Sequence, residues 1–264
     1  MRKCESLNCL GKHGIETKDL VNHCFLIFKK FKIYQLISNL STEEMLKVIL
    51  ATIFILGAFG SQDTPIPTKP DGYALGSTNP TLHIEAYFDL LCPDCRDSWN
   101  VLEPILRNEY NITTNQTLRF TIHLFPLPFH VNSFMVSQGA KVIGDNMKDI
   151  EDVFAYFNLI LQNQESYYTA ATLQFTQQQV QQNLTSLVCA NLPQYAQIFP
   201  GSLQYGNSYD SQARVTWKYG TYKGVRGTPT FVANGIVIVG ADNFNADDWR
   251  KFLNGSYQNR HISQ

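Results

Sequence analysis

The sequence predicts an α/β fold in which a small sheet with its helices is interrupted by a block of helices alone. Three observations lead to this prediction. Residues 81–125 follow the order strand, helix, strand, which is that of a parallel βαβ unit. Residues 131–205 show helical patterns without a strand. Two apolar runs then meet at Asn234-Gly235, which is the strongest short signal for a hairpin.

An apolar run near the start of the chain is typical of a secretory signal peptide. In residues 45–60, Lys47 precedes an uncharged run of about a dozen residues, and Ala58 and Gly60 are small residues where a signal peptidase cuts. The run is short for a membrane span. We interpret residues 1–44 as an upstream extension that is not translated, with translation starting at Met45. The alternative is a genuine extension, with the apolar run as a signal anchor or a buried element.

The elements up to residue 125 follow from turn residues and strand patterns. Residues 61–80 contain four prolines and two glycine turns, so we expect an unstructured N-terminus of the mature chain. Residues 81–88 are rich in β-formers and residues 118–125 alternate apolar and polar side chains, so both are expected to be strands. Residues 96–110 between them are expected to form a helix.

The rest of the chain is mostly helical by pattern. We expect helices at residues 131–143, 149–163, 176–190, 192–199 and 211–223. Glutamines in the third of these alternate with apolar residues, which is typical of a solvated helix face. The hairpin is expected to pair the runs on either side of Asn234-Gly235. Residues 245–253 close the fold as a helix, with Asn245 as its expected N-cap.

The segment Cys92-Pro93-Asp94-Cys95 lies where the first strand gives way to the first helix. Pro93 suits the first helical position, because the N–H that proline lacks has no partner there. The unpaired N–H groups and partial positive charge of a helix N-terminus favour a thiolate at Cys92. Cys95 lies one turn further on the same face, within reach of a short-loop disulfide. This arrangement predicts reversible dithiol chemistry.

Composition argues against several other classes of function. Residues 61–264 hold 13 Lys and Arg against 17 Asp and Glu, an acidic balance that disfavours nucleic acid or an anionic membrane as partner. Their cysteines number three, so they are no disulfide-stapled scaffold, and Cys189 is expected to be a small buried hydrophobe. A zinc site would need two further ligands, which Cys189, His123 and His130 could supply only by accident of folding, so no metal is expected.

The cysteine pair after the first strand, the helical block after the second, Gly227-Thr228-Pro229 before the hairpin and the closing helix together resemble a known family. It is the DsbA-like branch of the thioredoxin-fold thiol-disulfide oxidoreductases. The resemblance covers roughly residues 80–253 and implies a thioredoxin-like domain of residues 81–130 and 206–254, with a helical insertion at 131–205.

The resemblance also implies roles for individual residues. Cys92 would be the nucleophile, and Cys95 would resolve the mixed disulfide. Thr228-Pro229 matches the family's cis-proline loop, which lies against the cysteine pair. Such a loop would bind an extended substrate segment by presenting the Thr228 backbone to it as a short added strand.

Two departures from the family pattern bear on reactivity. Strongly oxidising members commonly have Pro-His between the cysteines, whereas this chain has Asp94, whose carboxylate should disfavour the thiolate and make a milder oxidant, or an isomerase or reductase. Relatives often have Glu six residues before the nucleophile, where this chain has Ala86, and Glu85 should face the opposite side. Asp89 is the nearest other carboxylate, as a modulator of the pair or as part of the turn. His130 could face the site or lie in a surface loop.

Four N-x-[ST] sequons follow the predicted signal peptide, more than expected for a cytosolic protein. The acceptor residues are Asn111, Asn115, Asn183 and Asn254. The last residues of the chain are not a lumenal retention signal. We therefore expect a glycoprotein of the secretory pathway, in the endoplasmic reticulum lumen or secreted, with no stable membrane span after signal cleavage.

The sequence thus predicts an enzyme, a protein thiol-disulfide oxidoreductase with no cofactor beyond the redox-active Cys92–Cys95 disulfide. Its expected partners are thiol- or disulfide-containing proteins or small thiols, together with a redox recycling partner. One alternative is a glutathione-linked, kappa-like transferase or isomerase, which the complete cysteine pair disfavours because such proteins commonly have serine at the nucleophile position. The other is a non-catalytic thioredoxin-fold binding protein.

Overall fold

The computed structural model describes residues 41–44, 46–47, 65–67 and 69–255, and the chain divides into two units, Met1–Asp63 and Thr64–Gln264. In the first unit, residues 42–44 and 46–47 are helical, and Ser41 and Glu44 exchange backbone-to-side-chain hydrogen bonds. Most of the predicted upstream extension and signal peptide lies outside the described residues. Of the helices in the described part of the chain, none is long and apolar enough to cross a bilayer.

In the described part of the second unit, a five-stranded sheet has the order β1-β3-β2-β4-β5. Its strands are β1 (Tyr73–Gly76), β2 (Leu82–Phe88), β3 (Leu118–Leu124), β4 (Thr230–Ala233) and β5 (Ile236–Val237). β2 and β3 are parallel, which confirms the predicted βαβ unit, and the other neighbouring strands are antiparallel. Asn234 and Gly235 both have positive φ, 47° and 86°, in the predicted hairpin turn between β4 and β5.

Helix α3 (Pro93–Pro104) connects β2 to β3 and begins three residues before the predicted start at residue 96. Cys92 is its N-cap in an extended conformation, and Pro93 is the first helical residue, where its missing N–H leaves no bond unmade. The helix continues as a π-helical turn, Ile105–Glu109, which accounts for the rest of the predicted helix. Its start therefore places both cysteines at the carboxyl end of β2.

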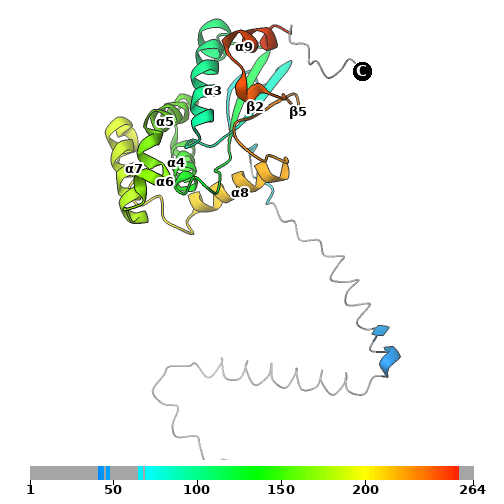
Figure 1. Ribbon diagram of the computed structural model, residues 1–264, viewed down its shortest axis with the longest axis vertical. Coiled ribbons are helices and arrows are strands. Elements are labelled where there is room, and N and C mark those ends of the chain that lie inside the picture. Colours follow the sequence, from blue (N-terminus) through cyan, green and yellow to red (C-terminus); the bar gives the residue numbers. More distant parts are fainter. Residues whose placement is uncertain (1–40, 45, 48–64, 68, 256–264) are drawn as a thin grey trace, which may run out of the picture. The chain divides into compact units, whose positions relative to one another are not determined.

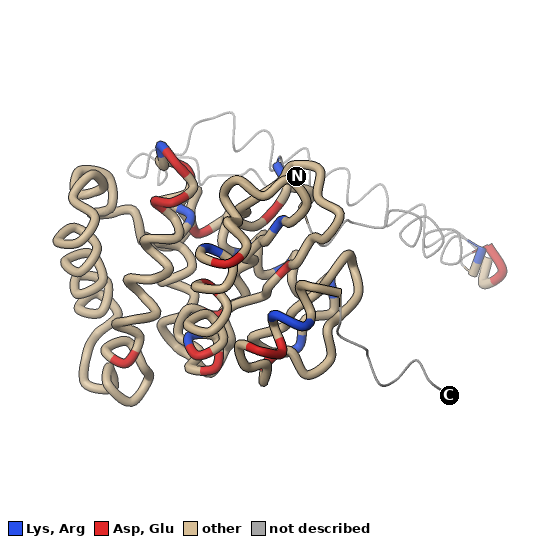
Figure 2. Tube along the Cα trace, turned by 90° about the horizontal axis from the view of Figure 1, so that it is seen from above, with Lys and Arg blue, Asp and Glu red and all other residues tan. Residues whose placement is uncertain are grey.

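The helices between β3 and β4 gather to one side of the sheet and beneath it in Figure 1. They are α4 (Ser133–Asn146), α5 (Ile150–Asn163), α6 (Thr169–Thr172), α7 (Gln177–Asn191) and α8 (Ser208–Tyr222), with 3₁₀ turns at Gln164–Tyr167 and Pro193–Tyr195. α4 packs against α5 and against α8. The glutamine-rich α7 buries Val180, Leu184 and Val188 and carries no charged residue along its length (Figure 2), so its predicted polar outer face is confirmed.

Helices cover both faces of the sheet. On one face, Phe88 of β2 meets Trp99 of α3 edge-on at 6.4 Å, and Phe231 of β4 meets Trp249 at 4.9 Å. Trp249 belongs to the closing helix α9 (Ala246–Leu253), whose predicted N-cap Asn245 accepts from two backbone N–H groups. The opposite face packs on α8. The sheet and these aromatic side chains support the turn that carries Cys92 and Cys95, called the cysteine turn below.

The prediction that residues 61–80 are unstructured is wrong for Tyr73–Gly76, which form β1 and pair antiparallel with β3. Turn signals lie on both sides of this four-residue segment, so its alternation was too short to identify a strand. Burial of Tyr73 and Leu75 against the core stabilises the strand in the fold. The predicted helix at 192–199 is also shorter than expected, because only Pro193–Tyr195 is helical, as a 3₁₀ turn.

Candidate active site

Cys92 and Cys95 lie at the start of α3 and point into the protein. Cys92 is 4% exposed and Cys95 is completely buried. Both are free thiols here, as is the partly buried Cys189 on α7, among the described residues. Because Cys92 is the N-cap and Cys95 follows one helical turn later, the two side chains interact through a hydrogen bond. Cys92 is therefore the more accessible of the two thiols.

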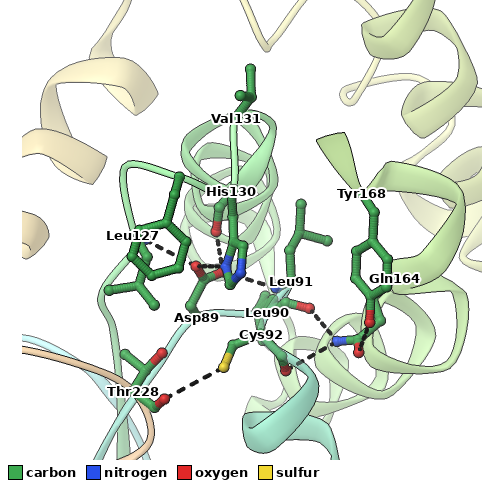
Figure 3. A network of polar contacts seen from close by, with 12 residues as sticks. Asp89, Leu90, Leu91, Cys92, Leu127, His130, Val131, Gln164, Tyr168 and Thr228 are labelled. Carbon is green, nitrogen blue, oxygen red and sulfur yellow. Dashed lines mark hydrogen bonds and ion pairs between the residues drawn. The ribbon is translucent and has the colours of Figure 1, made fainter. Parts of the chain in front are cut away.

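The loop before β4 faces the cysteine pair. The Thr228–Pro229 peptide bond is cis, as the sequence predicts. The Cys92 thiol donates to the Thr228 carbonyl oxygen at 3.4 Å, a contact between residues 136 positions apart (Figure 3). Thr228 also lowers the pKa of both thiols through its side chain. The structure thus brings together the four residues Cys92, Cys95, Thr228 and Pro229.

The two thiols differ in acidity. A hydrogen bond with the Cys95 side chain, which outweighs burial, lowers the pKa of Cys92 to about 6, with help from the backbone N–H groups of Cys95 and Asp94 and from Thr228. Those N–H groups belong to the first turn of α3, where a helix stabilises an anion. Burial raises the pKa of the Cys95 thiol well above its ordinary value. Cys92 can therefore be a thiolate near neutral pH while Cys95 keeps its proton.

Asp94 affects Cys92 differently from what its side chain suggests. The carboxylate is exposed to solvent, where its charge is well screened. The backbone N–H of Asp94 lowers the pKa of Cys92, which is opposite in sign to the effect expected of the carboxylate. Pro93, also exposed, contributes by starting the helix. The peptide backbone between the cysteines thus favours the thiolate whatever side chains it carries.

Asp89 is completely buried beneath the cysteine turn. One carboxylate oxygen accepts from the Leu91 backbone N–H at 2.8 Å and from the Ser133 hydroxyl. The other accepts from the Leu127 backbone N–H at 2.9 Å and from His130 Nδ1 at 2.7 Å. The Asp89 backbone carbonyl also accepts from the Cys92 N–H at 3.0 Å. This residue therefore joins the cysteine turn, the loop after β3 and the start of α4.

His130 lies in the site rather than in a detached surface loop. Its side chain is 21% exposed and bonds to Asp89, which has none of its surface exposed. That hydrogen bond, opposed by burial and supported by the charges of Asp89, Cys92 and Asp94, raises the pKa of His130. The sequence left its position open because the loop from residue 126 to 132 has no periodic pattern from which a direction can be inferred.

Gln164 is a site residue that the sequence did not indicate. Its side chain is completely buried and donates to the carbonyl oxygens of Leu90 at 3.1 Å and Cys92 at 3.3 Å. Its own oxygen accepts from the Tyr168 hydroxyl at 2.6 Å. Figure 3 shows Gln164 reaching the cysteine turn from the side opposite Asp89 and His130. Gln164 reaches the cysteine turn because it begins the 3₁₀ turn after α5. No sequence pattern indicates a contact of this kind.

A cavity of about 640 Å³ opens beside the cysteine turn and the cis-proline loop. Its walls come from the outer side of α3, the cis-proline loop and the turn before α9, and they include Asp94, Asp97, Thr228, Pro229 and Phe244. The cavity is large enough for a side chain or a short segment of a substrate. One of its lining residues, Thr228, contacts the Cys92 thiol.

Glu85 and His123 lie away from the cysteine pair. Glu85 faces away from the cysteines, as expected, and its carboxylate accepts from His123 Nε2 at 3.2 Å, while His123 Nδ1 lies 2.9 Å from the Asp71 carboxylate. His123 is therefore held by two carboxylates in a buried structural cluster. Within the described ranges, no group of three or more His, Cys, Asp or Glu is arranged to hold a metal ion.

The predicted glycosylation acceptors differ in accessibility. Asn111, Asn183 and Asn254 are exposed, on the turn after α3, on α7 and after α9. Asn115 is partly buried, and its amide donates to the Tyr110 carbonyl at 3.0 Å while its oxygen accepts from Thr117 and Leu118. The side-chain oxygen of Asn254 accepts from the Tyr110 hydroxyl at 2.8 Å, so its nitrogen, to which a glycan would be attached, is not used in that bond.

A family model described as Thioredoxin matches residues 68–255. Among solved structures, a proposed protein-disulfide isomerase from Pseudomonas syringae is similar at 17% identity and a TM-score of 0.55, over 69% of this chain and 98% of that one. DsbA from Chlamydia trachomatis is similar at 16% and 0.54, over 77% and 99%. BdbD from Bacillus subtilis is similar at 14% and 0.51, over 73% and 96%. At these identities the structures show a shared fold. No curated protein sequence matches significantly.

Proposed function

The chain belongs to the thioredoxin family and has the fold of DsbA-type thiol-disulfide oxidoreductases, and from this premise we propose that it exchanges disulfides through Cys92 and Cys95. One observation carries the proposal. A thiol with a pKa of about 6 lies at a helix N-terminus against a cis-proline loop, and a completely buried second thiol lies within hydrogen-bond reach. Nucleophilic attack needs a thiolate, and resolution needs a second thiol held next to it.

As an oxidant, the protein would begin with the Cys92–Cys95 disulfide. A substrate thiolate attacks Sγ of Cys92, the bond to Cys95 breaks, and Cys95 leaves as a thiolate that takes up a proton. A second substrate thiolate attacks the substrate sulfur of this mixed disulfide and expels Cys92 as a thiolate. The substrate gains a disulfide, and its two electrons remain on the cysteine pair. As a reductant, the same steps run in reverse.

Substrate binding would use the cis-proline loop and the cavity next to it. The Thr228 carbonyl already accepts from Cys92, so a segment attached to Cys92 would lie along the Thr228–Pro229 backbone. An extended segment can bond to such a backbone as an added strand, which is independent of its sequence. The substrates are therefore proteins or peptides with an accessible cysteine or disulfide, and small thiols such as glutathione for recycling.

The acidity of Cys92 supports a moderate potential. A strongly oxidising disulfide goes with a nucleophile pKa of about 3.5, and a reducing one with about 7. A pKa of about 6 lies between these values, nearer to the reducing end. The pair would therefore be a milder oxidant or an isomerase rather than a strong oxidant.

The place of action follows from the N-terminal segment and the sequons. An apolar run of signal-peptide type precedes the described second unit, and three of the four sequon asparagines in it are exposed. Both features favour a glycoprotein in the lumen of the endoplasmic reticulum or outside the cell. Peptide-N-glycosidase treatment of protein made in a eukaryotic secretory host should reduce its mass.

Reduction of insulin by dithiothreitol and reoxidation of a reduced, unfolded substrate test the activity in both directions. The wild type should accelerate at least one of them, and Cys92→Ser should abolish the acceleration. Cys95→Ser should accumulate a mixed disulfide between Cys92 and substrate, visible on non-reducing gels. Cys189→Ser is the matched control and should behave as the wild type. Equal rates for the wild type and Cys92→Ser would leave the chain a non-catalytic member of its family.

A further inference from the structure

His130, in the loop after β3, contacts the carboxylate of Asp89 beneath Cys92. His130 Nδ1 lies 2.7 Å from an oxygen of Asp89, and the other Asp89 oxygen accepts from the N–H of Leu91, which directly precedes Cys92. The Asp89 backbone carbonyl accepts from the N–H of Cys92 itself. A single residue, Asp89, therefore connects His130 to the nucleophile, and the Asp89 side chain is completely buried.

We propose that His130 is a positioning residue which, as an imidazolium held by Asp89, stabilises the thiolate of Cys92 and shifts the exchange equilibrium of the pair toward its reduced form. This inference rests on the proposed function and adds a regulation of the same site. The cysteine motif of this chain contains an aspartate, Asp94, and no cation between its cysteines. In this proposal the cation that favours the thiolate comes instead from the loop after β3.

Charge balance gives the physical reason. Reduction by two glutathione thiols yields glutathione disulfide, a Cys92 thiolate, a Cys95 thiol and one released proton. The site gains a negative charge, since two neutral sulfurs become a thiol and an anion. A cation nearby stabilises that product and not the uncharged disulfide. Where His130 is neutral in the oxidised form, it can bind the released proton as the thiolate appears, so that the charge of the site does not change.

The surroundings of His130 are consistent with a cation there. The anionic groups that face it are Asp89, Cys92 and Asp94, and their charges raise its pKa. The cations of α8 that share a cavity wall with it are Arg214 and Lys218. Arg214 is engaged with Asp210 at 2.8 Å, which offsets its charge. Ser133 of α4, which also bonds to Asp89, is neutral.

The test is the equilibrium of the pair with glutathione, measured at pH 7 on the full chain by alkylation and mass. His130→Gln removes the charge and keeps a side chain that can donate to Asp89. Loss of one nearby charge should shift the equilibrium toward the disulfide form by about 3- to 10-fold, the range expected for a charge at this separation in a partly screened site. His83→Gln is the control, because His83 is partly buried and bonded to Thr121. It should leave the equilibrium unchanged.

The pH dependence separates this role from a structural one. The difference between the wild type and His130→Gln should be largest near neutral pH and vanish above about pH 9, where the wild-type imidazole is neutral. His130→Lys keeps a charge and should retain the wild-type equilibrium at pH 7 but stay more reduced than the wild type at pH 9. The thiolate absorbance at 240 nm should show a higher pKa for Cys92 in His130→Gln.

Any one of three results overturns the inference: His130→Gln has the wild-type equilibrium at pH 7, the shift in His130→Gln is the same at every pH from 6 to 9, or His130→Lys has the equilibrium of His130→Gln at pH 7. A wild type that never forms the Cys92–Cys95 disulfide with glutathione is a different failure, since it refutes the proposed function itself. The control at His83, in β2, identifies any shift that comes from changing a partly buried histidine away from the cysteine pair.

Discussion

Two buried carboxylates join the sheet of this protein to its helices, and they do so by different means. Asp89 accepts from two backbone N–H groups, a hydroxyl and one histidine, all around the cysteine turn. Asp71, just before β1, contacts side chains among the described residues: His123 at 2.9 Å, Lys141 at 3.6 Å and the hydroxyl of Thr216. Asp89 therefore sets the path of the backbone at the site, while Asp71 ties three elements together at a distance from it.

The difference separates a positioning role from a stabilising one. A carboxylate that holds backbone N–H groups determines where neighbouring residues lie, and Cys92 is among those neighbours. A carboxylate that holds cationic side chains gives charge compensation, which matters for the free energy of unfolding and varies with pH. Loss of Asp89 should affect both stability and the thiol chemistry, whereas loss of Asp71 should affect stability alone.

The largest effect is expected for Asp89→Ala. It leaves two buried N–H groups, a hydroxyl and an imidazole without their acceptor, which should destabilise the protein by about 3–5 kcal/mol. Chemical denaturation monitored by tryptophan fluorescence measures the loss. Asp89→Asn keeps the shape and part of the bonding, so it should lose less and allow the glutathione equilibrium to be measured. Unchanged stability in Asp89→Ala would contradict the role of this residue as a junction.

Asp71→Asn should lower the free energy of unfolding by less than Asp89→Ala does, and its effect should depend on pH. Burial alone would raise the pKa of Asp71, but hydrogen bonding to His123, the charge of Lys141 and the Thr216 hydroxyl lower it from 3.8 to about 2. A lowered folded-state pKa stabilises the fold above the unfolded value, and that stability is lost as pH falls toward 2. Asp71→Asn should therefore cost about 2 kcal/mol at pH 7 and little at pH 2.

The control for that measurement is the glutathione equilibrium of the same variant. Because Asp71 contacts neither cysteine nor the cis-proline loop, Asp71→Asn should leave the equilibrium at its wild-type value. A shift there would show that the two carboxylates do not differ in the way their partners indicate, and the comparison would fail.

The sequence predicted the cysteine turn well and its supports poorly. Cys92, Pro93 and Cys95 depend on local rules, since a strand end, a helix start and a proline at the first position fix their places. Thr228 and Pro229 required the family resemblance, because a contact across 136 residues has no local signal. The positions of the predicted helices agree with the structure to within a few residues, except at 192–199, where only a 3₁₀ turn forms.

The polar residues that support the cysteine turn show why their contacts could not be predicted from the sequence. Asp89 could be seen as a nearby carboxylate, but its four donors come from the turn, the loop after β3 and α4, and only tertiary packing assembles them. Gln164 lies among other polar residues of an exposed-looking segment, and its burial depends on how the insertion closes over the turn. β1 was missed for a related reason, because its pairing with β3 and not its own pattern defines it.

Gln164→Leu tests the support from the other side of the turn. The leucine keeps roughly the volume but removes the donor to the Leu90 and Cys92 carbonyls, so the protein should lose about 1–2 kcal/mol of stability. Gln182→Leu on the exposed side of α7 is the matched control and should change stability by less than about 0.5 kcal/mol. Equal stabilities for the two variants would contradict the role of Gln164 in holding the turn.

The smallest effect is expected for Asp94→His, which changes only an exposed side chain. Removal of a negative charge and addition of a partial positive one beside the nucleophile should favour the thiolate, so the reduced pair gains stability and the reduction potential rises. Screening by solvent limits the shift in the glutathione equilibrium to about 3- to 10-fold toward the reduced form.

Asp97→His is the control for Asp94→His, because Asp97 is also exposed and lies two residues past Cys95, on the outer side of α3. It should move the equilibrium less than Asp94→His does. An unchanged equilibrium in Asp94→His would mean that the backbone N–H groups of the first helical turn, together with Cys95, set the acidity of Cys92 by themselves. The aspartate would then have no part in making this pair a mild oxidant, and the supports beneath the turn would be the remaining place to look for its cause.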